Sequence, residues 1–155
     1  MGVSTGEPPP ERGGAYTYVG SIAFQYAPER DREPDPGEIV WTWVSFEENA
    51  HLGKDRPVAI VGRTADGRYA SLMLSSQDHQ GDRGWVSIGA GPWDREGRVS
   101  WLRTDRVLAV HGEAVRREGA IMTREVYDRV VLAMGGGAPV KRTRFTRIRR
   151  LFGRT

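Results

Sequence analysis

Two side chains suited to phosphate chemistry stand at the ends of neighbouring strand-like segments. Arg56 precedes the aliphatic residues 58–61, and Ser75 follows the strand-like residues 69–74. An arginine presents a planar fork of N–H donors that matches phosphate oxygens, and a serine hydroxyl can donate to a nonbridging oxygen. Residues 66–67, Asp-Gly, are a strong hairpin signal because glycine adopts positive φ without strain. The predicted antiparallel hairpin brings Arg56 and Ser75 to the same end of a sheet.

Further polar groups flank this pair. Lys54 lies two residues before Arg56 and is one of only two lysines among the 23 basic residues. His79 follows Ser75 in a polar loop, and His51 precedes Arg56; an imidazole is suited to act as a general base. For each histidine the alternative is a solvated loop side chain. For Arg56 the alternative is a surface ion pair with one of the acids nearby in the sequence, Asp55, Glu47 or Glu48.

The length and composition indicate one domain without disulfides. The chain has 155 residues and no cysteine, which excludes disulfides, thiolate metal sites and a cysteine nucleophile. The three histidines are scattered, and the sequence holds no Walker loop and no HExxH motif, so no metal site and no cofactor is predicted. No run approaches the ~20 apolar residues of a membrane span. The start of the chain does not resemble a secretory signal, and a cytoplasmic location is expected.

The charge is divided unevenly along the chain. The formal net charge is +3, but residues 141–155 alone contribute +7, which leaves −4 for residues 1–140. The predicted organisation follows from this division and from local composition: a disordered lead over residues 1–14, a single domain over residues 15–137, and a basic tail over residues 138–155. The tail is interpreted either as a basic amphipathic helix or as a mobile solvated segment.

Short strand patterns fill the middle of the chain. Residues 39–46 have two largely apolar faces, as in a strand covered on both sides. Residues 53–57 are interpreted as the end of a polar loop. Residues 16–26 repeat aromatic and aliphatic side chains with period two, which is typical of an edge strand or of a platform on which unpaired bases stack. The remaining predicted strands are residues 58–61, 69–74, 85–88, 99–102 and 106–111.

These strands, at close spacing, predict a mainly β (α+β) fold built on a small barrel. One helix is predicted near the end, over residues 123–134. Thr123 is a plausible N-cap, apolar residues recur at helical spacing, and three glycines at 135–137 end the helix.

Three segments carry a family resemblance through their order and residue types. Residues 36–41 read Pro-Gly-Glu-Ile-Val-Trp, residues 53–58 read Gly-Lys-Asp-Arg-Pro-Val, and residues 74–77 read Leu-Ser-Ser-Gln. Together they resemble the PemK/MazF family of toxin endoribonucleases, in which a Gly-x-x-Arg-Pro loop follows the opening strand and a later strand closes on a hydroxyl residue. The resemblance covers residues 36–134, including later similarity in residues 100–110 and in the helix 123–134.

The resemblance implies an SH3-like barrel that forms a homodimer, cleaves single-stranded RNA without a metal, and is held inactive by a cognate antitoxin. By position, Arg56 matches the family's active-site arginine and Ser75 matches its active-site threonine. The RNA's own 2′-hydroxyl would attack the phosphorus, and the protein would orient the groups and stabilise the developing charge. The residues predicted to bind the RNA are Lys54, Ser76, Gln77 and His79.

A second interpretation uses the same barrel without catalysis. A related toxin family with this fold binds a topoisomerase, and the present chain could bind such a protein partner, or bind RNA without cutting it. The mildly acidic body is unfavourable for strong RNA binding, since phosphate contacts supply most of the nonspecific affinity for nucleic acid. A local basic patch is expected to offset it, formed by Lys54, Arg56, Arg63 and Arg83.

Overall fold

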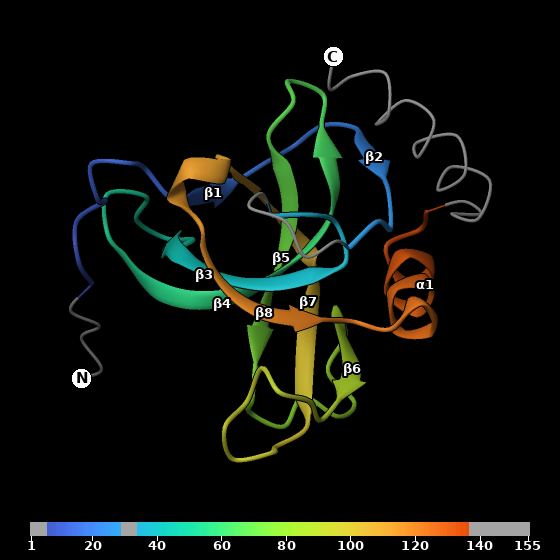
Figure 1. The fold of residues 1–155 in the computed structure, drawn as a ribbon. Helices are drawn as coiled ribbons and strands as arrows, with labels where there is room; N and C mark the ends of the chain where they lie inside the picture. Colours follow the sequence, from blue (N-terminus) through green and yellow to red (C-terminus); the bar gives the residue numbers. More distant parts are fainter. Residues whose placement is uncertain (1–5, 29–33, 137–155) are drawn as a thin grey trace.

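The computed structural model describes residues 6–28 and 34–136, and their backbone forms one continuous sheet with a single α-helix beside it (Figure 1). In these described ranges the elements are, in chain order, β1 (Ala15–Thr17), β2 (Ile22–Phe24), β3 (Glu38–Ser45), β4 (Gly53–Thr64), β5 (Tyr69–Ser75), β6 (Trp85–Gly89), β7 (Ser100–Val110), a 3-10 turn (Gly112–Ala114), β8 (Arg116–Ile121) and α1 (Arg124–Ala133). The mainly β class with a C-terminal helix is confirmed.

The sheet closes into a ring. Along it, β4 pairs with β5, β5 with β7, β7 with β1 and β1 with β3, and β3 returns to β4. The short strand β1 is therefore the link that joins β7 to β3. Strands β2 and β8 extend the sheet beyond this ring, and β6 pairs with β7. This ring-like arrangement fits the barrel that the sequence predicts.

A buried arginine holds the closing strand in place. Arg106 on β7 is only 5% exposed, and its guanidinium donates to Thr17 Oγ1 at 2.8 Å and to the Ser45 carbonyl oxygen at 2.9 Å. Thr17 ends β1 and Ser45 ends β3, so a single side chain ties together the three strands at the closure. Burial is the main cause that lowers the pKa of Arg106.

Alternation along the strands divides the apolar residues between two clusters. The ring cluster is formed by β1, β3, β4, β5 and β7, and the helix-side cluster lies between the sheet and α1. On β3, for example, Ile39 belongs to the helix-side cluster, while Val40 and Val44 belong to the ring cluster. Because β3 is covered on both faces, both sets of its side chains are apolar, as the sequence predicts.

The helix is fixed at its start and against the sheet. The Thr123 hydroxyl accepts a hydrogen bond from the Val126 N–H at 3.2 Å, which confirms the predicted N-cap. Tyr127 is fully buried, and its hydroxyl donates to the Val61 carbonyl oxygen of β4 at 2.7 Å. Gly135 follows the helix with φ of 81°, in the left-handed region that ends helices.

The structure differs from the sequence prediction in the extent of two strands. Residues 53–57 are not a loop; they form the first part of β4 and pair with β3 from Gly53 opposite Ser45 to Pro57 opposite Trp41. A proline fits there because the ladder to β5 begins only at Val58, so one edge of residues 54–57 pairs with no described strand. The predicted strands 99–102 and 106–111 are one strand, β7, whose polar middle part runs along the surface.

Strand β8 was not predicted, because its sequence, Arg-Arg-Glu-Gly-Ala-Ile, lacks the apolar alternation of a half-buried strand. The period-two segment 16–26 is also not one strand: β1 and β2 are separate short strands. The interpretation of this segment as a stacking platform for bases stays a prediction, and the contacts of three of its aromatic residues favour a packing role. Phe24 and Tyr26 pack against the helix-side cluster, and Tyr16 lies 5.6 Å from Trp43 between ring centroids.

The ends of the chain are described only in part. Residues 6–14, placed by composition in a disordered lead, run beside the start of β4, where Glu7 and Gly53 exchange two backbone hydrogen bonds. The basic tail, residues 138–155, lies outside the described residues. The division of the chain at residues 14 and 137 stays a prediction.

Removing the Tyr127 hydroxyl should weaken the docking of α1 on the sheet. We expect Tyr127→Phe to lower the free energy of unfolding by about 1 kcal/mol, since a buried hydrogen bond is lost while the ring stays. The matched control is Tyr18→Phe, whose hydroxyl donates to the Ser21 carbonyl oxygen and accepts from the Ala65 N–H. Both hydrogen bonds are exposed, so water can replace them, and we expect a change in stability of less than about 0.5 kcal/mol. Urea unfolding measures both, and equal effects of the two changes would contradict this account of the helix.

Candidate active site

A cavity of about 700 Å³ opens where β4 and β5 separate. The β4–β5 ladder ends at the pair Val58–Met73; before it β4 pairs with β3, and after it β5 pairs with β7. The fork between the two strands is the floor of the cavity. The lining residues are Trp41, Lys54, Asp55, Arg56, Pro57, Leu74, Ser75, Ser76, Gln77, Pro92, Trp93, Asp94, Arg95, Glu96, Arg98, Ser100 and Arg116.

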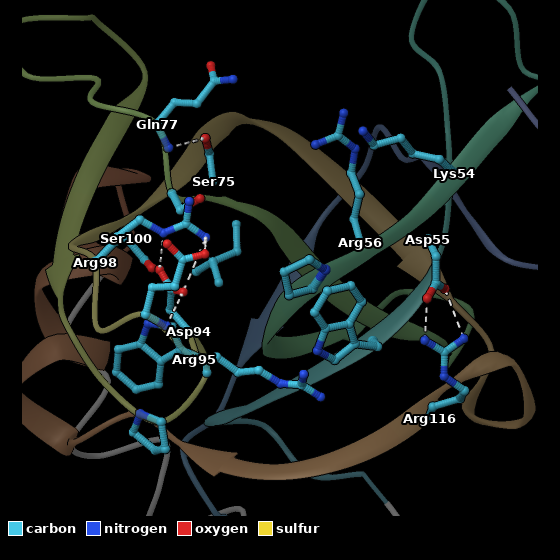
Figure 2. A pocket seen from close by; sticks show the side chains of 17 residues that line it. Lys54, Asp55, Arg56, Ser75, Gln77, Asp94, Arg95, Arg98, Ser100 and Arg116 are labelled. Carbon is cyan, nitrogen blue, oxygen red and sulfur yellow. Dashed lines mark hydrogen bonds and ion pairs between the residues drawn. The ribbon is translucent and has the colours of Figure 1, made fainter. Parts of the chain in front are cut away.

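Arg56 and Ser75 both line this cavity, as Figure 2 shows. The reason is the strand register. Val58 lies opposite Met73, and side chains alternate along each strand, so Arg56 and Ser75, two residues beyond this pair, emerge on the same face. The sequence argument that a hairpin brings the two groups to one end of the sheet therefore describes their position correctly. Their catalytic role stays a prediction.

Arg56 makes no hydrogen bond or ion pair with any residue that the structure describes. Two of the three acids that could pair with it are already bound to other arginines. The Asp55 carboxylate accepts two hydrogen bonds from the Arg116 guanidinium, and the Glu47 carboxylate accepts a hydrogen bond from Arg103 at 3.0 Å. Burial lowers the pKa of Arg56. The guanidinium is thus partly desolvated with its donors unused by the described chain, which is the state required to receive an anion.

Ser75 is held in a hydrogen-bond network that continues behind the cavity. Its Oγ accepts from the Gln77 N–H at 3.1 Å and lies 3.1 Å from His79 Nε2. The other ring nitrogen, His79 Nδ1, lies 3.1 Å from Asp82 Oδ2. The imidazole is stacked on the Trp85 indole with ring centroids 3.6 Å apart and planes 5° from parallel. Its position is thereby fixed from three sides.

The residues predicted to bind RNA fall into two groups. Lys54, Ser76 and Gln77 line the cavity. His79 does not; it lies behind Ser75 and is 16% exposed. His51, the other candidate base, is an exposed residue in the turn before β4 and does not line the cavity.

The far wall of the cavity was not predicted. This wall is formed by residues 92–98, in the loop that connects β6 to β7. The segment carries two more arginines, Arg95 and Arg98 (Figure 2). Arg98 donates to Asp94 at 2.9 Å, and this hydrogen bond is the main cause that lowers the pKa of Asp94. Arg95 makes no hydrogen bond or ion pair with the described part of the chain. In sequence the segment shows only the pattern of a polar turn, and nothing there indicates that it forms the cavity wall opposite Arg56.

Trp93 anchors that segment through a partly buried ring. Its ring packs against the helix-side cluster and against Gly91, where any Cβ atom would overlap the indole. Two buried polar atoms of cavity residues, Trp93 Nε1 and Ser100 Oγ, have no hydrogen-bond partner among the described residues. Such groups are costly unless something in the cavity binds them.

Two arginines expected near Arg56 lie away from the cavity. Arg63 stands at the other end of β4, where it donates to the Gly67 carbonyl oxygen at 3.0 Å and lies over the Tyr69 ring. Arg83 is exposed in the loop before β6 and does not line the cavity. Three other arginines line the cavity instead; Arg98 and Arg116 are paired with Asp94 and Asp55, while Arg95 has no partner in the described chain.

Within the described ranges, no three histidine or acidic side chains are grouped so that they could hold a metal ion. In the same ranges, no helix has the length and apolar character needed to cross a bilayer.

Comparison with known proteins bears on this geometry. No curated protein matches the chain. The family of PemK-like, MazF-like toxins of type II toxin-antitoxin systems matches residues 35–134, a range that runs from just before β3 to the end of α1 and includes the whole cavity. The predicted family resemblance over residues 36–134 is confirmed. The chain belongs to the PemK-like, MazF-like toxins of type II toxin-antitoxin systems.

Proposed function

We propose that this chain is the toxin of a type II toxin-antitoxin pair and acts as an endoribonuclease on single-stranded RNA. The observation that carries the proposal is an arginine without a partner in the described chain, Arg56, on the same cavity as a hydroxyl, Ser75. A partly buried guanidinium that has no anion of its own is suited to bind one, and a phosphodiester matches its planar fork.

The surroundings of Arg56 support a nucleic-acid ligand. Lys54 and Arg95 also have no partner in the described chain, while the two aspartates of the cavity are paired with arginines. Their negative charge is therefore largely offset and repels a phosphate less than free carboxylates would. Trp41 and Pro57 give the cavity an apolar surface on which a base can lie. Its volume is in the usual range for a small-ligand site, roughly 300–1,000 Å³.

In the proposed reaction the 2′-hydroxyl of the RNA attacks the adjacent phosphorus. Arg56 binds two phosphoryl oxygens and stabilises the negative charge that grows on them. Lys54 adds positive charge to the cavity lining. The Ser75 hydroxyl, which also lines the cavity, orients the attacking 2′-hydroxyl. The products are a 2′,3′-cyclic phosphate and a free 5′-hydroxyl. No step of this route requires a metal.

The proposed partners follow from the same assignment. A cognate antitoxin would bind the toxin and block cleavage, and the active form would be a homodimer. Because the proposed substrate includes messenger RNA, the site of action would be the cytoplasm.

Replacing Arg56 should abolish cleavage. We expect Arg56→Ala to lower the cleavage rate by at least roughly 100-fold, because the main stabiliser of transition-state charge is removed. Arg56→Lys keeps the charge but loses the fork, and we expect an intermediate rate. The assay follows a mixed-sequence single-stranded RNA in EDTA and detects cyclic-phosphate ends.

The matched control for Arg56→Ala is Arg63→Ala, on the same strand but away from the cavity; it should cleave at the rate of the unmodified chain. RNA that stays intact with a large excess of the unmodified chain would overturn the ribonuclease proposal and favour a barrel that binds a protein partner, or RNA without cutting it.

Removing the cavity carboxylate Asp55 should strengthen RNA binding. In Asp55→Asn one negative charge is lost and Arg116 is released from its ion pair. We expect the dissociation constant for an RNA with a 2′-deoxy residue at the cleavage position to fall roughly twofold to fivefold at low salt. The control is Asp66→Asn, an equivalent arginine-paired aspartate in the β4–β5 turn, away from the cavity. Equal effects of the two substitutions would show that the ion pair at the cavity has no special role.

A further inference from the structure

For a neutral His79 imidazole, the contacts behind Ser75 favour one placement of the protons. The Asp82 carboxylate can only accept, so the proton between it and His79 belongs to Nδ1. A neutral imidazole protonated at Nδ1 presents a lone pair at Nε2, and the group that faces it is the Ser75 hydroxyl. Since Ser75 Oγ already accepts from the Gln77 N–H, its own proton points to Nε2. The chain of donors runs from Ser75 through His79 to Asp82.

We propose that His79, oriented by Asp82, accepts through Ser75 the proton that the attacking 2′-hydroxyl loses. This inference rests on the proposed ribonuclease function and supplies the proton acceptor that Arg56 and Lys54 cannot provide, because an arginine or lysine is normally already protonated. His79 is a positioning residue in this scheme: it lies behind Ser75, does not line the cavity, and acts on the RNA only through the serine hydroxyl.

Every bond and every proton of the proposed step can be accounted for. The bond between O2′ and phosphorus forms as the bond between phosphorus and O5′ breaks. The 2′ proton moves to Ser75 Oγ while the serine proton moves to His79 Nε2, and the imidazolium is stabilised by Asp82. The leaving O5′ takes a proton from solvent water, while Arg56 stays protonated and bound to the phosphoryl oxygens. The hydroxide left in solvent then removes the proton from His79.

The packing around the imidazole favours a role beyond anchoring the loop. The groups that face the ring are Ser75 from β5, Asp82 from its own loop, Trp85 from β6 and, edge-on at 6.4 Å, Trp101 from β7. Asp82 is the charged group among them. The two indoles restrict rotation of the ring, so Nε2 is held toward Ser75, and the carboxylate is 59% exposed, which leaves a route for the proton to solvent.

The first test reads the tautomer of the full-length chain without RNA. Long-range proton–nitrogen NMR correlations report which ring nitrogen of each histidine carries the proton, and His51→Gln, His79→Gln and His111→Gln assign the three signals. We expect His79 to be protonated at Nδ1 and to lose this preference in Asp82→Asn. A His79 protonated at Nε2 in the unmodified chain would overturn the relay.

The second test measures cleavage of an RNA with one cleavable bond. We expect His79→Gln to lower kcat on the order of 100-fold with KM unchanged, the usual size of a general-base contribution, and to remove the loss of rate at acid pH. Asp82→Asn should lower kcat roughly tenfold. The matched control is Asp78→Asn in the same loop, whose carboxylate accepts from the Gln80 N–H; it should leave kcat unchanged.

The outcomes separate the two proposals. If the unmodified chain cuts RNA, and both His79→Gln and Asp82→Asn cut with unchanged kcat and pH profile, the relay is wrong and the ribonuclease proposal stands. If the unmodified chain cuts no RNA, the ribonuclease proposal fails and the relay fails with it. Asp82 is an exposed side chain, so Asp82→Asn tests the relay even if His79→Gln does not fold.

Discussion

A partly desolvated arginine without an anion of its own is the constraint on which the rest of the site depends. Burying a guanidinium costs free energy unless it is paired, and here the neighbouring acids are used elsewhere, Asp55 by Arg116 and Glu47 by Arg103. The described chain thus leaves Arg56 with donors and no acceptor. Natural proteins retain an energetically unfavourable arrangement of this kind mainly where function requires it. Binding of an external anion would offset the free-energy cost of desolvating the Arg56 guanidinium.

The position of that arginine follows from one strand that changes its neighbour. Residues 53–59 of β4 pair with β3, residues 58–63 pair with β5 and residues 62–64 pair with β2, while β5 continues along β7. Where two paired strands separate, a fork opens between them, and residues of both strands line it. The fork is rigid because the ring is closed behind it by β1 and by the buried Arg106. The cavity is therefore a consequence of sheet topology, and the catalytic candidates are carried by strands as well as by a loop.

The sequence predicts the parts of this structure whose signals are local. Two largely apolar faces identify β3, the Asp-Gly turn identifies the β4–β5 hairpin, and Thr123 identifies the start of α1. It does not predict β8, whose polar sequence becomes a strand only because β3 offers it an edge to pair with. Nor does it predict that segment 92–98 covers the cavity, since the contact between Trp93 and Gly91 and the packing on the helix-side cluster are tertiary. The partners of Asp55 and Glu47 come from β8 and β7, strands far away in the sequence, so the isolation of Arg56 could not be derived from its neighbours.

The same tertiary pairing answers the objection that an acidic body should bind RNA poorly. Residues 1–140 sum to −4, but a phosphate responds to the charges within about one Debye length, roughly 8–10 Å at moderate salt, more than to the total. The lining residues of the cavity include five basic side chains (Lys54, Arg56, Arg95, Arg98 and Arg116) and three acidic ones (Asp55, Asp94 and Glu96). Arg116 pairs with Asp55 and Arg98 pairs with Asp94, while Lys54, Arg56 and Arg95 have no partner in the described chain. The local balance is positive although the surrounding domain is not. A surface of this kind binds an anion at one place and repels it at most others, so in the proposed function the acidic body would direct RNA to the cavity rather than oppose its binding.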